Sequence, residues 1–174
     1  MITAAAPNAA KRVLRETLQR ALSCVTQSVL VDRSGAIESD FSLACQLTAA
    51  SDNGRIVLPV YHFFTLVADT SRDRHHRWEA HTTGYSYRIG DTDDREILAY
   101  HWHPSGRSLE ARPHLHLGAG AGPLRSELQK AHLGTGFVTP VPLITLLLES
   151  FAVRPRRPDW AAVLASADHA LASP

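Results

Sequence analysis

The stretch WEAHTTGYSYRIGDTDDREILAYHWH (residues 78–103) contains the clearest structural pattern of the sequence. Apolar and polar residues alternate on both sides of GDTDD (residues 90–94), which is typical of two strands joined by a hairpin loop. The apolar positions that share one face are Tyr85, Tyr87, Ile89, Leu98, Tyr100 and Trp102. The pattern therefore predicts an antiparallel hairpin with one face directed into the core.

Further strands are expected on both sides of this hairpin. Short apolar or alternating runs predict strands over residues 29–31, 41–47, 55–68 and 113–118. Pro59 lies inside the longest of these runs, and a proline there favours an edge position or a bulge. The segment GAGAGP (residues 118–123) is typical of a flexible break after the last strand.

Helical patterns lie at the two ends of the sequence. Apolar residues recur at spacings of three and four over residues 9–27, and further helices are predicted over residues 139–151 and 160–171. The fold class expected is α+β: an N-terminal helix, an antiparallel sheet of about five to six strands, and C-terminal helices packed on one sheet face. Residues 1–8 are expected to form a disordered tail, and residues 9–174 a single domain.

The composition excludes several classes of protein. The 174 residues carry a formal net charge of +1, so no strong overall field favours nucleic acid. Two cysteines without a CxxC motif exclude a disulfide scaffold and a cysteine-rich zinc module. We see no secretory signal and no apolar run near the roughly 20 residues needed to span a bilayer. The sequence thus predicts a cytoplasmic protein with no membrane partner.

Histidine is the unusual component, with ten residues in the chain. Strand alternation directs His101 and His103 to the face of their strand that lies away from the core residues. It does the same for His114 and His116 in their strand. If these two strands are neighbours, four histidines project from one open sheet face. Centring the hairpin on its loop places Gly84 opposite His101, which would leave space at that point.

One chemistry available to this face is metal-free cleavage of RNA or another nucleic-acid phosphodiester. Two imidazoles can act as general base and general acid near neutral pH, and a nearby cation stabilises the charge that develops on phosphorus. The residues predicted to be catalytic are His101, His103, His114, His116 and Arg112. Those predicted to bind substrate are Arg107, Lys130 and His132. This mechanism needs no cofactor.

Two other functions remain open from the residues alone. The same four histidines, His101, His103, His114 and His116, could be ligands of a zinc-dependent hydrolase, with water completing the site. Alternatively, the sheet face could dock a protein partner without catalysis, as in a binding or regulatory module.

The order of tyrosine, arginine, aspartate and histidine residues from 85 to 116 also resembles a known family. The residues that carry the likeness are Tyr85, Tyr87, Arg88, Asp91, Asp94, Ile97, Leu98, Tyr100, Pro113, His114 and His116. Over residues 78–153 this pattern resembles small TumE-like bacterial toxin proteins. The resemblance implies one half of a bacterial toxin–antitoxin pair, with a DNA-binding antitoxin encoded by a neighbouring gene as a partner, and together with the histidine face it suggests a toxin-type enzyme that acts on RNA. It implies no catalytic residues of its own.

Overall fold

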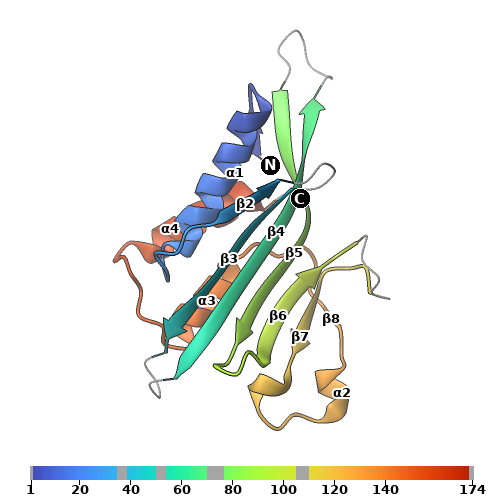
Figure 1. Ribbon diagram of the computed structural model, residues 1–174, viewed down its shortest axis with the longest axis vertical. Coiled ribbons are helices and arrows are strands. Elements are labelled where there is room, and N and C mark those ends of the chain that lie inside the picture. Colours follow the sequence, from blue (N-terminus) through green and yellow to red (C-terminus); the bar gives the residue numbers. More distant parts are fainter. Residues whose placement is uncertain (1, 35–38, 50–53, 70–76, 105–109, 173–174) are drawn as a thin grey trace.

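The hairpin at residues 78–103 lies within an eight-stranded antiparallel sheet in the computed structural model (Figure 1). The structure describes residues 2–34, 39–49, 54–69, 77–104 and 110–172. Its elements are β1 (Ile2–Ala4), α1 (Pro7–Leu22), β2 (Val31–Ser34), β3 (Ser39–Thr48), β4 (Arg55–Asp69), β5 (Arg77–Gly90), β6 (Glu96–Trp102), β7 (His114–Leu117), the 3₁₀ helix η1 (Ala119–Ala121), α2 (Ser126–Gln129), β8 (Leu133–Gly134), α3 (Val141–Glu149) and α4 (Trp160–Leu171). The strand order is β2-β3-β4-β5-β6-β7-β8, with β1 paired to β5.

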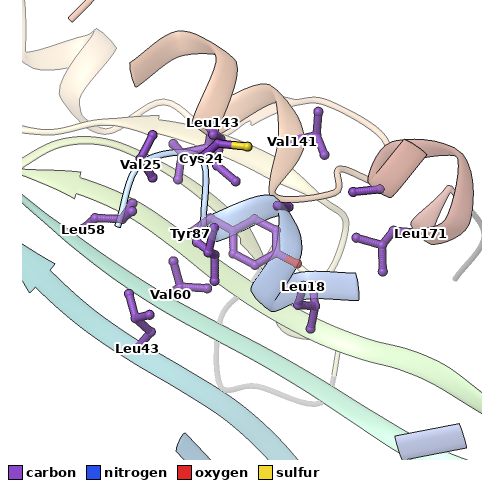
Figure 2. Close-up of a cluster of buried hydrophobic side chains, with 14 of the residues drawn as sticks. Leu18, Cys24, Val25, Leu43, Leu58, Val60, Tyr87, Val141, Leu143 and Leu171 are labelled. Atoms are coloured by element: carbon purple, nitrogen blue, oxygen red, sulfur yellow. The ribbon is translucent and has the colours of Figure 1, made fainter. Parts of the chain in front are cut away.

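The hydrophobic core lies between this sheet and helices α1, α3 and α4. The apolar stripe of α1 is buried, including Leu14 and Leu18, as the sequence periodicity predicts. Side chains from β3, β4 and β5 meet residues of α1, α3 and α4 in one cluster (Figure 2). The predicted α+β class, with an N-terminal helix, an antiparallel sheet and C-terminal helices, is therefore confirmed, although the sheet has more strands than expected.

Two tyrosines of β5 are fixed through their hydroxyl groups, Tyr85 to the segment before α3 and Tyr87 to the neighbouring strand β4. The Val138 N–H donates a hydrogen bond to the Tyr85 hydroxyl oxygen at 3.0 Å, just before α3 begins. The Tyr87 hydroxyl and Nδ1 of His62 are hydrogen-bonded at 2.6 Å, and Nε2 of His62 lies 3.3 Å from the Thr82 hydroxyl. Burial lowers the pKa of His62 to about 3, so this imidazole is neutral in the folded protein.

Three expectations about the chain are corrected. Residues 2–4 form β1 rather than a disordered tail, because Ile2 is buried against the core and β1 pairs with β5. Pro59 is not in an edge strand, since β4 lies between β3 and β5 and Pro59 is opposite Ala44. The bulge of β4 lies elsewhere, between Phe63 and Phe64.

The glycine-rich segment after β7 is also more ordered than the sequence suggests. Residues 119–121 form η1, which lies against β6. A Cβ atom at Gly118 would overlap the Glu96 carbonyl oxygen, and one at Gly120 would lie 2.7 Å from the Arg95 carbonyl oxygen. Glycine is therefore required here by close backbone approach rather than by flexibility. No helix in the described part of the chain is long and apolar enough to cross a membrane.

Candidate functional site

The pairing of β6 with β7 brings the histidines together. His101 lies opposite His114, and Ala99 lies opposite His116. The alternate residues pair Tyr100 with Leu115 and Leu98 with Leu117, and the side chains of Tyr100 and Leu98 pack against the core. Because side chains alternate along a strand, the histidines point away from the core, on the face that the sequence pattern predicts.

Three of these histidines form a compact cluster. One ring nitrogen from each of His101, His114 and His116 lies within 4.8 Å of the other two. The ring centroids are 5.1 Å apart for His101 and His116, and 4.8 Å apart for His114 and His116. We call these three residues the histidine cluster.

Two further predicted histidines lie at its margins. The His103 ring is 5.7 Å from that of His101 and equally far from the Phe63 ring. His132, just before β8, is exposed, and its ring lies 4.4 Å from that of His116 and 4.9 Å from that of His114. Both contact the cluster, but neither belongs to the set of three ring nitrogens that converge.

His114 has a defined tautomer. Its Nδ1 lies 2.7 Å from the carbonyl oxygen of Arg112, and a carbonyl can only accept a hydrogen bond. Nδ1 therefore carries the proton, and the lone pair is on Nε2. His114 is also only 4% exposed, so its ring is held in place by the surrounding protein.

The electrostatics of the cluster favour the neutral form of His101 and His116. Burial, followed by charge repulsion from His116, His103, His114 and Arg88, lowers the pKa of His101 to about 4. Burial also lowers the pKa of His116, with smaller contributions from His132 and His114. At neutral pH His101 therefore presents an unprotonated nitrogen, which is the form that binds metals.

The basic residues predicted to act beside the histidines are not gathered as the histidines are. The guanidinium of Arg112 donates hydrogen bonds of 2.9 and 3.0 Å to the two carboxylate oxygens of Glu110, and its side chain is exposed. Lys130 is exposed at the end of α2. Arg107 lies outside the described residues.

Residues of β5 that the sequence reasoning did not select lie beside the cluster. Ser86 is opposite His101, and Arg88 is opposite Ala99, so both share the face of the histidines. A groove of about 570 Å³ runs from these two residues across β4 and β3. Alternation along β5 places the side chains of Ser86 and Arg88 on the other face of the sheet from the buried Tyr85 and Tyr87. This pattern in the sequence could have identified both residues.

No family model, curated protein or solved structure matches the chain.

Proposed function

We propose that the histidine cluster binds a divalent transition-metal ion of the zinc type, and that the protein is a metal-dependent hydrolase. The observation that carries this proposal is the convergence of three imidazole nitrogens, from His101, His114 and His116, within 4.8 Å. Catalytic zinc sites have three protein ligands and leave one position for water or substrate, whereas structural sites use four.

The surroundings of His114 add support. Histidines that bind metal nearly always donate their second ring N–H to a carboxylate, a backbone carbonyl or water, which fixes the tautomer. His114 makes this bond through Nδ1 to the Arg112 carbonyl, so Nε2 is its ligand atom. Neutral imidazoles without thiolates suit zinc, copper and nickel better than magnesium or calcium.

Bound zinc supplies Lewis acidity and lowers the pKa of a coordinated water to about 7. The chain's own contribution is to hold three imidazoles on one face of the sheet, with Ser86, which lines the groove, directly across from His101. Strands hold such ligands more accurately than loops do.

Metal-free cleavage of RNA, with an antitoxin as partner, stays a prediction, and the geometry supports it less than it supports the metal site. A general acid needs a pKa near the working pH, and that of His101 is lowered to about 4. The Arg112 guanidinium, the cation predicted to stabilise phosphorus, bonds Glu110 instead.

The metal site is tested on protein purified without a histidine tag. We expect one zinc ion per chain by metal analysis. In calorimetric titrations, His101→Ala, His114→Ala and His116→Ala should each weaken binding by more than the roughly 10- to 100-fold typical of losing an outer-shell partner. His169→Ala is the matched control, since His169 is exposed in α4 and α4 packs in the core layer on the other sheet face.

The hydrolytic activity is tested separately with an activated ester, 4-nitrophenyl acetate. Turnover should disappear after chelation and return with zinc in the wild type, but not in His101→Ala. Zinc binding that is unchanged in all three cluster variants would contradict the metal site. Zinc binding at the cluster with no metal-dependent turnover would contradict the hydrolase alone.

A further inference from the structure

The groove beside the histidine cluster has a composition of its own. It lies on the open face of the sheet, and residues of four elements or loops line it: Ala44 and Gln46 of β3, Val57, Pro59 and Tyr61 of β4, Ser86 and Arg88 of β5, and Thr92 and Asp94 of the hairpin loop. Its volume of about 570 Å³ is within the range of small-molecule sites.

The sheet register joins the groove to the cluster. Ser86 is the cross-strand neighbour of His101, and Arg88 is the neighbour of Ala99, which in turn is the neighbour of His116. Directly opposite residues of antiparallel strands have Cβ atoms roughly 5 Å apart. Ser86, at one end of the groove, therefore lies next to His101 on the same sheet face.

The two walls of the groove differ in chemistry. On β4, Val57, Pro59 and Tyr61 offer apolar and aromatic surface. On the other side the cation is Arg88, whose side chain is 23% exposed. A partly desolvated guanidinium binds carboxylate or phosphate oxygens through paired, charge-assisted hydrogen bonds.

Arg88 is occupied by a partner that a ligand can replace. Its guanidinium pairs with the carboxylate of Asp94 and also donates to the Asp94 carbonyl oxygen at 3.2 Å. The Asp94 side chain is 69% exposed, and ion pairs with such an exposed partner contribute little free energy. The Asp94 carboxylate is therefore a weak competitor for an anion that also buries apolar surface on β4.

We propose that this groove is the substrate site of the metal centre and that it selects small molecules with an apolar body and an oxyanion, held by Arg88. The oxyanion is a carboxylate or a phosphate, since both present the same oxygen pair to a guanidinium. This inference rests on the proposed function for the reaction, but binding in the groove can be measured without metal.

The test is an NMR titration of the full-length protein, metal-free and zinc-loaded, with three probes: benzoate, phenyl phosphate and neutral benzamide. In the metal-free protein we expect benzoate or phenyl phosphate to shift the amide signals of Ser86, Arg88 and Asp94, and benzamide to bind more weakly. The tighter of the two anions identifies the oxyanion. Arg88→Gln should weaken that anion roughly tenfold, because a hydrogen bond to a charged group is lost.

Two further variants keep the test decisive. Arg95→Gln is the matched control, because Arg95 is an exposed arginine of the same hairpin that pairs with Asp91 and does not line the groove. Asp94→Asn removes the competing carboxylate and should tighten anion binding roughly twofold. Asparagine also tolerates the left-handed backbone of this position, where φ is 59°.

Equal affinity for benzamide and both anions, or anion binding unchanged in Arg88→Gln, would overturn the inference. Zinc affinity measured on the same samples separates the two proposals. If the wild type binds the anion at Arg88 but binds no zinc, the metal site is contradicted and the groove is not. If the wild type binds zinc at the cluster but binds no anion at Arg88, the groove is contradicted and the metal site is not.

Discussion

At the scale of single residues, two histidines show how burial decides chemistry. His114 is nearly inaccessible, yet the hydrogen bond from its Nδ1 to the Arg112 carbonyl leaves Nε2 ready to bind a ligand. His62 is equally buried on the other sheet face, where both ring nitrogens bond to Tyr87 and Thr82. His62 is therefore a component of the core, and His114 is available for function.

His62 should make the protein less stable in mild acid. Its pKa is about 3 in the folded state against about 6.5 when unfolded, so between these values the unfolded chain binds a proton that the folded chain does not. Stability is thus fully present above about pH 6.5 and is lost as the pH falls toward 3. The contribution is on the order of 1.4 kcal/mol per pH unit.

Urea denaturation between pH 7.5 and 4.5 measures this effect. His62→Gln should be less stable than the wild type at pH 7.5, but its free energy of unfolding should fall less steeply as the pH is lowered. The difference between the two slopes should be about that of one bound proton, roughly 1.4 kcal/mol per pH unit. His101, whose pKa is lowered to about 4, keeps part of the slope in this variant. Identical slopes for the wild type and His62→Gln would show that His62 does not titrate as described.

At the scale of elements, the sequence predicts the face of each strand better than its register. Alternation alone places Tyr85 and Tyr87 in the core and the histidines outside it, because parity does not depend on where the hairpin turns. The register is one residue pair away from that expected: Tyr87 pairs with Tyr100, and His101 with Ser86. Gly84 lies instead beside the carbonyl oxygen of Trp102.

The physical reason for the register lies in the hairpin loop. The Asp91 carboxylate accepts hydrogen bonds from the backbone N–H groups of Asp93 and Arg95, and Asp94 has a left-handed backbone. The pairing also shifts between Ile89 and Gly90. Side-chain bonds and a bulge of this kind cannot be read from alternation. The convergence of three histidines was predictable only as a shared face, since their distances depend on this register.

The segment after β7 provides a prediction at the same scale. Gly118→Ala should destabilise the fold by about 1–3 kcal/mol, because the added methyl group would overlap the backbone of Glu96 and push η1 away from β6. Gly54→Ala is the control, since no atom lies within 4 Å of a Cβ atom there, and its effect should stay within about 0.5 kcal/mol. Thermal or urea unfolding measures both. Equal stability of the two variants would contradict the close approach at Gly118.

At the scale of the whole molecule, the sheet separates two tasks. One face is covered by α1, α3 and α4 and supplies the stability of the fold (Figure 1). The other face, over β3 to β7, carries the groove and the histidine cluster. Since the core residues and the histidines alternate on the same strands, the rigidity of the core is transmitted directly to the candidate ligands.

We propose that His101, His114 and His116 hold one metal ion, and anomalous diffraction from crystals of the zinc-loaded, tag-free protein tests this proposal most directly. We predict one strong anomalous peak per chain, at about 2.0–2.1 Å from one nitrogen of each of the three rings, with Nε2 as the ligand atom of His114. A peak elsewhere, or none at the cluster under saturating zinc, would contradict the account.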